Sequence, residues 1–391
     1  GDLYESTDKR KDSAFTIFYM GINAGALFAP LICGFFAAEG SWSNPGAFKW
    51  GFFCAGVAMI ISIVVFACGK KKYLKTPDGY LIGLAPRKSD LRKIKENESK
   101  SELSDSNSKA KNSPFRLWAC LIGAILLFVI FSLNTSNFND YISAAIYAIS
   151  IVLPVFIITD RGLTSIEKMR IGVIYIIAVF VIFFWSAFEQ AGSSLTIFAD
   201  KQCDRWIGNW EMPTTWFQSI NPIVVVCCAP LMAVMWEFLL KRGIDIPSPV
   251  KQAIGLLLLS IGYIIIAIGT NGLKEGEKAS MWWLFALYFI HTIGELSLSP
   301  IGLSMVNKLS PVRLASLLMG VWFMSNAASN ILAGNLATLL PIDGEPAKSF
   351  CGFEVATLTD FFTIFAIMSG IAAILLFCLC PLLKKMMKGI D

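Results

Sequence analysis

The sequence predicts an all-α integral membrane protein with ten transmembrane helices, and three observations lead to this fold class. The 391 residues are 55% hydrophobic and only 16% charged, with a mean hydropathy of +0.62, which is too apolar for a water-facing surface. The apolar residues gather in runs of roughly 20 residues or more, long enough for a helix to cross a bilayer. None of these runs alternates polar and apolar residues, as the strands of a membrane β-barrel do.

The predicted spans follow one another along the whole chain, interrupted by one long hydrophilic stretch. The second part of that stretch is rich in Lys, Ser, Glu and Asn and has little to bury, which predicts a cytoplasmic linker. The two spans after it carry no charge at mid-span, so we expect them to pack on the lipid-facing side. The spans cover residues 15–38, 47–68, 115–133, 138–158, 171–199, 214–239, 251–269, 280–306, 314–340 and 358–383.

This order divides the chain into four parts. Residues 1–68 are expected to form the end of a first half with two helices, and residues 69–114 the linker. Residues 115–159 are then an inserted helix pair, and residues 160–391 a six-helix half. A long linker before six spans is typical of transporters built from two six-span repeats. Since the chain starts without Met and runs from a charged stretch straight into a span, we expect four helices of the first half to precede residue 1.

The basic residues predict the orientation of the chain in the membrane. With the first residue in the cytoplasm, 27 of the 33 Lys and Arg residues lie on the cytoplasmic side and 6 on the outer side. The positive-inside rule predicts this bias, so both ends are expected to be cytoplasmic, in a multi-pass protein of the cell's cytoplasmic membrane. The net charge of +5 follows from topology, and no basic cluster interleaved with aromatic residues points to nucleic acid.

The ten cysteines predict no metal site. Eight lie in or beside the spans, where Cys behaves as a small hydrophobe, and none has partners at metal-site spacing. Cys203 and Cys351 lie in outer loops, and the sequence is compatible with a disulfide between them or with two free thiols.

Two carboxylates lie deep in predicted spans. Glu189 is in "FFWSAFEQAGSSL", with Trp185 one turn before it and Ser193 one turn after it, and Glu295 is near the middle of its span. A charge at the bilayer centre costs about 2.5 to 3.5 kcal/mol, so such residues usually face a cavity or a partner. We predict that both glutamates, with Trp185, line a polar cavity; for each, a structural hydrogen bond to a neighbouring helix is the alternative.

A polar stripe is predicted around Glu295. His291, Glu295, Ser299 and Gly302 recur at helical spacing and should share one face. For the single histidine, a core imidazole with a local hydrogen bond competes with a proton relay. Pro300 removes a backbone hydrogen bond one turn from the carboxylate, so it is a predicted hinge.

Amides and aromatic residues complete the predicted cavity. Asn221 precedes Pro222 in "WFQSINP", which places an amide and a second predicted hinge at one level. Asn23 projects beside a ridge of small residues in the first span. A single Asn more often joins two helices than binds a ligand, but several together with two carboxylates predict a polar cavity with aromatic walls. The remaining members are Trp322, Phe323, Asn326 and Asn330.

No Lys or Arg lies deep in a predicted span, so these spans supply anions, amides and aromatic groups. If the substrate is dipolar, a cation from other helices must bind its carboxylate.

Four segments resemble the signatures of the proton-dependent oligopeptide transporters, the peptide-transporter branch of the major facilitator superfamily. They are "DSAFTIFYMGINAGALFAPLICG", "FFWSAFEQAGSSL", "WFQSINP" and "GELSLSPIGLSMVNKLSP". The resemblance implies the major facilitator superfamily transporter fold, with family helices 5 and 6, two inserted helices of the prokaryotic type and helices 7 to 12. Helices 1 to 4 would lie outside this chain. The short outer loop at residues 270–279 leaves no room for the large extracellular domain of animal relatives.

The resemblance also implies an activity. It implies proton-coupled symport of di- and tripeptides by alternating access, by a monomer in the bilayer that uses protons and no other cofactor. Asn23, Asn221 and Glu295 match positions that contact peptide, with Glu295 facing the amino terminus. Glu189 matches the carboxylate of helix 7 that pairs with an arginine of helix 1 in proton coupling and at the outer gate. The other matching positions of the site are Ser299, Trp322, Phe323 and, with variable identity, Asn326.

The sequence leaves other functions to compare with peptide symport. Some members of the family carry a non-peptide solute such as nitrate or a glucoside. A non-transporting sensor would more naturally carry an attached soluble domain. An enzyme is disfavoured by the single His and by the lack of a metal-ligand cluster or a Gly-rich phosphate loop, and a channel would need a continuous polar pore.

Overall fold

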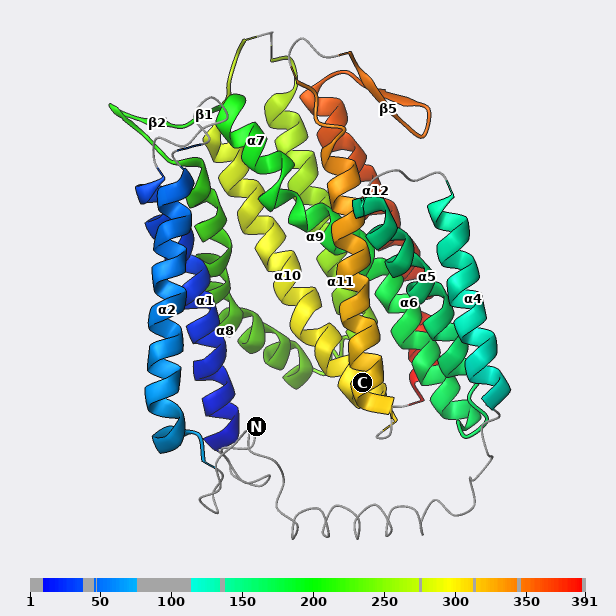
Figure 1. Cartoon of the computed structure of the whole chain (residues 1–391). Helices are drawn as coiled ribbons and strands as arrows, with labels where there is room; N and C mark the ends of the chain where they lie inside the picture. Colours follow the sequence, from blue (N-terminus) through cyan, green and yellow to red (C-terminus); the bar gives the residue numbers. More distant parts are fainter. Residues whose placement is uncertain are drawn as a thin grey trace. The chain divides into compact units, whose positions relative to one another are not determined.

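The computed structural model is largely helical and divides into two compact units, residues 1–111 and 112–391, which we describe separately (Figure 1). It describes residues 10–37, 46, 48–75, 114–133, 138–273, 276–311, 314–342 and 346–388; the side chains of residues 10–20, 114, 138 and 139 are not included.

The first unit is a helix pair. Helix α1 spans Arg10–Phe36 and α2 spans Phe48–Tyr73. They approach closely at Gly51, where a β-carbon would lie 3.0 Å from the carbonyl oxygen of Cys33. The second predicted span ended at residue 68, but α2 continues through three lysines in its last turn, whose charge suits the negative end of the helix dipole. Most of the predicted linker, residues 76–113, lies outside the described residues.

The second unit contains nine helices within its described residues, and short strands join their ends at one side (Figure 1). The helices are α4 (Pro114–Ser132), α5 (Phe138–Ile158), α6 (Ser165–Phe188), α7 (Ser194–Lys201), α8 (Ile220–Lys241), α9 (Ser248–Thr270), α10 (Met281–Leu309), α11 (Ala315–Ala337) and α12 (Leu358–Met387).

Three pairs of strands connect these helices at the predicted outer end. β1 pairs in parallel with β4, and the two other pairs are antiparallel hairpins, β2 with β3 and β5 with β6. The strands are β1 (Cys203–Asp204), β2 (Trp206–Ile207), β3 (Trp210–Glu211), β4 (Ala279–Ser280), β5 (Lys348–Phe350) and β6 (Phe353–Val355).

The predicted spans agree with the helices. Within the described residues, nine helical stretches are long and apolar enough to cross a membrane, and α1 adds a shorter apolar stretch, Gly21–Phe36. Hydropathy identifies them because a segment in lipid must satisfy its own backbone hydrogen bonds, which a helix does.

Two predicted spans are not continuous α-helices. The span at residues 171–199 is broken: α6 ends at Phe188, a 3₁₀ turn follows over Glu189–Gly192, and α7 starts at Ser194. The span at residues 214–239 begins with a 3₁₀ turn, Thr214–Ser219, before α8. The expectation that Ser193 lies one helical turn after Glu189 is therefore wrong, because α6 ends at Phe188 and Ser193 lies between the 3₁₀ turn and α7.

Helix α9 lies at the centre of the second unit, packed against α10 and α12. Its glycines recur every seven residues, at Gly255, Gly262 and Gly269, and so fall on one face of the helix. Each lies where a β-carbon would overlap α10, against Gly294, His291 and Trp283 respectively. Small residues let two membrane helices approach to backbone contact, so this face sets the distance between α9 and α10.

The inserted helices lie at the edge of the second unit, as expected. Helix α4 packs against α5, and α5 packs against α11 and α6. No residue in the most apolar stretch of α4 is buried. Arg116 joins the pair near its predicted cytoplasmic end, with its guanidinium 3.6 Å from the Asp160 carboxylate.

Candidate functional site

The first site contact joins α8 to α10. The Nδ2 group of Asn221 donates to Oε2 of Glu295 at 2.7 Å and to Oγ1 of Thr292 at 3.1 Å. Thr292 in turn donates to the backbone carbonyl of Tyr288 one turn earlier, at 2.7 Å. The amide therefore points its donor at the carboxylate, and the two predicted residues are neighbours. The sequence analysis missed Thr292, although it stands three residues before Glu295 and so shares its side of the helix.

Asn221 and the predicted hinge residue Pro222 lie in the first turn of α8, directly after the 3₁₀ turn Thr214–Ser219. The backbone of Ser219 and Ile220 is helical, so the 3₁₀ turn runs on into α8. Because proline has no N–H to donate at this junction, Pro222 stays a predicted hinge. The interior proline of α8 is Pro230, and Figure 1 shows α8 bent partway along its length. Pro300 is interior to α10, as predicted.

Glu189 lies in the 3₁₀ turn between α6 and α7. Its side chain is half-buried, and its carboxylate has no hydrogen-bond or ion-pair partner in the described part of the chain. It is close enough to Glu295 for the two charges to interact. Trp185 is half-buried one turn before it, with its ring 5.2 Å from that of Phe188 in an edge-to-face contact.

The predicted stripe on α10 divides among three neighbours. The buried His291 faces α9, where Nε2 donates to the carbonyl of Leu259 at 3.1 Å and the ring packs 4.8 Å from that of Tyr263. Glu295 faces α8, and Gly302 meets the ring of Trp322 on α11. Residues four apart are offset by about 40° around a helix, so a long stripe drifts from one neighbour to the next. The single histidine is therefore a locally satisfied core residue.

Among the predicted site residues, two have a buried polar atom with no hydrogen-bond partner within the described ranges. The hydroxyl of Ser299 and Oδ1 of Asn326 are both buried, on α10 and α11. Trp322 is buried, whereas Phe323 is 55% exposed. Asn330 is exposed and donates only to the carbonyl of Asn326 in its own helix, at 2.9 Å. The structure thus gives Asn330 a local role and leaves Ser299 and Asn326 available for a ligand.

Asn23 belongs to the first unit, where it is buried on α1. The other predicted site residues belong to the second unit.

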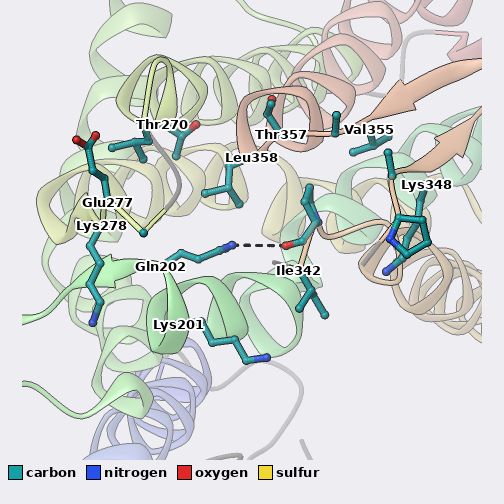
Figure 2. A pocket seen from close by; sticks show the side chains of 16 residues that line it. Lys201, Gln202, Thr270, Glu277, Lys278, Ile342, Lys348, Val355, Thr357 and Leu358 are labelled. Carbon is teal, nitrogen blue, oxygen red and sulfur yellow. Dashed lines mark hydrogen bonds between the residues drawn. The ribbon is translucent and has the colours of Figure 1, made fainter. Parts of the chain in front are cut away.

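A cavity of about 430 Å³ lies at the predicted outer end of the second unit, near the ends of α7, α9 and α12 (Figure 2). Lys201, Lys278 and Lys348 line it, but their amines point in different directions in Figure 2. Glu277 also lines it. None of the predicted site residues does, so this cavity is separate from the site around Glu295.

The two loop cysteines are free thiols in this structure. Cys203 is buried in β1, and Cys351 is exposed. Burial raises the pKa of the Cys203 thiol to about 12; Asp204 adds to the rise, and Arg205 and Lys278 oppose it. The described residues contain no group of three or more His, Cys, Asp or Glu that could hold a metal ion.

This arrangement of helices and polar residues has relatives among known proteins. Residues 1–343 match the sequence profile of the POT family. The protein named "Uncharacterized transporter YclF" from Bacillus subtilis (strain 168) is 31% identical over 396 residues, covering 100% of this chain and 71% of that protein. Dipeptide and tripeptide permease A of Proteus mirabilis (strain HI4320) is 28% identical over 385 residues, covering 98% of this chain and 71% of that protein.

The fold is also found in a solved structure. The crystal structure of peptide transporter POT in complex with sulfate matches with a TM-score of 0.72 and 28% identity, over 100% of this chain and 71% of that one. The profile match, the two relatives and this fold lead to one conclusion: the chain belongs to the POT family of multi-pass membrane transporters.

Proposed function

We propose that the protein is a proton-coupled symporter that imports di- and tripeptides by alternating access. One observation carries the proposal: the Asn221 amide holds the Glu295 carboxylate at 2.7 Å, within electrostatic range of a second carboxylate, Glu189. The similarity to a dipeptide and tripeptide permease supports the substrate class.

The site suits a ligand recognised by its backbone. Glu295 offers an anion for a peptide's ammonium group, and Asn221 offers an amide beside it. Ser299 and Asn326 each have an uncommitted buried polar atom for a peptide amide, and Trp322 supplies an apolar wall. Every short peptide has these backbone groups, so contacts of this kind give affinity with little dependence on side chains. In this proposal Trp185 and Phe323 complete the lining.

Proton coupling is assigned to Glu189 and Glu295. A carboxylate paired with a cation stays charged, and one that binds a proton releases the cation, so protonation can exchange bridges between the halves of a transporter. One charge crossing 100 mV supplies about 2.3 kcal/mol, and one pH unit adds about 1.4 kcal/mol. Each tenfold accumulation of peptide needs about 1.4 kcal/mol, so one proton can drive a useful gradient.

The proposal includes the setting of the protein. We place it as a monomer in the cytoplasmic membrane with both ends of this chain in the cytoplasm, as the distribution of Lys and Arg indicates. Protons are the coupling ion, and Pro222, Pro300 and the break at Glu189–Gly192 are the places where helices can bend.

The function is tested by uptake into proteoliposomes that contain the complete protein. We expect labelled dialanine to accumulate when the lumen is alkaline and negative inside, and to stop accumulating when a protonophore is added. Unlabelled di- and tripeptides should compete, whereas nitrate and glucosides should not. Competition by nitrate or a glucoside but not by peptides would replace the peptide assignment with a non-peptide symporter, and a protein without any gradient-dependent flux would be a sensor.

A further inference from the structure

The break between α6 and α7 is stabilised by side-chain hydrogen bonds to its backbone carbonyls. Where a helix ends inside a protein, backbone carbonyls lose their helical partners and need others. Here the hydroxyl of Tyr263 on α9 donates to the carbonyl of Ala187 at 2.7 Å. Thr196 donates to the carbonyl of Ala191 at 2.7 Å. The carbonyl of Ser186 also accepts from a side chain, the amide of Gln190, at 3.0 Å.

Gln190 occupies the centre of this arrangement. It is fully buried, and its amide donates both to Ser186 and, at 3.0 Å, to the carbonyl of Ala333 on α11. Its oxygen accepts from the hydroxyls of Ser194 at 2.5 Å and of Ser193 at 3.4 Å. A glutamine amide has two donor hydrogens and two acceptor sites, so the whole hydrogen-bonding capacity of Gln190 is used. One side chain therefore links the end of α6, the start of α7 and the C-terminal part of α11.

The neighbouring Glu189 differs from Gln190 in its burial and in the hydrogen bonding of its side chain. Glu189 is half-buried, and its carboxylate makes no hydrogen bond or ion pair with the described residues. Both residues belong to the same four-residue 3₁₀ turn. The amide thus fixes the turn, and the turn presents the carboxylate.

We propose that Gln190 is a positioning residue for proton coupling: its hydrogen bonds hold the turn that presents Glu189 and tie that turn to α11. This inference rests on the proposed function, because Gln190 has this role only if Glu189 takes part in coupling. When the bonds of Gln190 are removed, the turn can rearrange and the surroundings of the carboxylate change. The pH dependence of transport should then change as well.

Other titratable groups also face this turn, and variants at Gln190 leave them in place. Tyr263 on α9 donates to the carbonyl of Ala187 just before the turn, and Tyr288 on α10 donates to that of Ala191 within it, at 3.5 Å. His291 lies with its ring 6.3 Å from that of Phe188, and Glu295 interacts electrostatically with Glu189. Helix α11 has no charged residue between Ala315 and Ala337. An altered pH profile in these variants therefore reports on the surroundings of Glu189 and its neighbours.

The test compares two kinds of transport by the complete protein in proteoliposomes. Uptake of labelled dialanine is driven by a proton gradient at external pH 5 to 8, and exchange is measured with dialanine on both sides and no gradient. For Gln190→Leu, we expect gradient-driven uptake to fall about tenfold more than exchange, because misplaced reacting groups lose rate steeply. The midpoint of the pH profile should move by about 0.5 units or more. Ser194→Ala removes one partner of Gln190 and should shift the midpoint in the same direction by less.

Gln202→Leu is the matched control. Gln202 lies at the other end of α7 and donates to the carbonyl of Pro341 at 3.5 Å, the dashed contact in Figure 2. This replacement removes a glutamine-to-carbonyl contact that lies outside the turn carrying Glu189, so the midpoint should stay where it is in the parent protein.

The outcomes separate this inference from the proposed function. If Gln190→Leu reduces uptake and exchange equally and leaves the midpoint unchanged, Gln190 has a structural role only and the inference is wrong. If that variant cannot be purified in folded form, Ser194→Ala decides, and an unchanged midpoint there overturns the inference. A parent protein without gradient-driven dialanine uptake contradicts the proposed function itself, before any variant is considered.

Discussion

The amide of Asn221 and the carboxylate of Glu295 form a hydrogen bond of 2.7 Å that joins α8 to α10. The Asn221 amide is therefore a partner that an incoming ammonium group must share or displace. This relationship makes the two residues separable by mutation, because one carries the charge and the other only orients it.

We predict that Glu295→Ala weakens binding of dialanine about 30-fold or more. Losing a charge-assisted hydrogen bond of about 2 kcal/mol accounts for this change. Asn221→Ala should weaken binding less, about fivefold, since the carboxylate remains. Binding is measured by calorimetry on the purified protein, with N-acetylated dialanine as a ligand that lacks the ammonium group.

The control for this series is Asn330→Ala, which removes an exposed amide that bonds only within its own helix. Its affinity should equal that of the parent. If acetylated dialanine binds Glu295→Ala much more weakly than it binds the parent, Glu295 does not recognise the amino terminus.

Glu189→Gln is predicted to abolish gradient-driven uptake of dialanine while exchange continues. The substituted amide keeps the size of the side chain but cannot release or bind a proton, so coupling is lost and the binding site remains. Parallel measurements of uptake and exchange in proteoliposomes check this. Retained gradient-driven uptake in Glu189→Gln would falsify the assignment of Glu189 to proton coupling.

The glycine face of α9 leads to a prediction about stability. A β-carbon on Gly255 would lie 2.8 Å from the carbonyl oxygen of Gly294, which is backbone and cannot rotate away. Gly255→Ala should therefore lower the free energy of unfolding by about 1 to 3 kcal/mol. Gly320→Ala on α11 is the control: nothing lies within 4 Å of its β-carbon, so that variant should be neutral or slightly stabilising. Thermal unfolding in detergent measures both, and equal unfolding temperatures would contradict the close approach of α9 and α10.

The loop cysteines are expected to differ in reactivity. A thiol reacts as its thiolate, and the pKa of Cys203, raised to about 12, leaves it almost entirely protonated at pH 8. Its ionised fraction should increase only as the pH approaches 12, so buried Cys203 should resist alkylation at pH 8 to 9. Exposed Cys351 should react at once, and in intact cells a membrane-impermeant maleimide should reach it. Mass spectrometry of labelled peptides locates the modification; labelling only after the cells are opened would reverse the predicted orientation.

The sequence predicted the helices well and their interruptions poorly. Each span is identified by its own apolar length, which is a local property. The break after Phe188 depends on partners far along the chain, since Tyr263 is 76 residues from Ala187 and Ala333 is 143 residues from Gln190. No proline marks the break, so hydropathy extended one helix across it.

Only part of the site could be predicted, because some of its residues depend on partners far along the chain. Glu189 and Glu295 stand out because a charge in an apolar run needs an explanation within the run itself. The direction of His291 could not be predicted, because Gly262 on another helix opens the space that its ring occupies. The sequence assigned no role to Gln190, because its side chain donates a hydrogen bond to a backbone carbonyl of α11, a helix far along the chain.

The seven-residue recurrence of glycine on α9 has a consequence for movement. Where Gly255 meets Gly294, backbone lies on backbone, and there is no rotamer through which the interface could slip or repack. We therefore expect α9 and α10 to move together as one rigid body. Any conformational change within the second unit would then occur where its helices are bent or interrupted, in α8 and in the turn that carries Glu189.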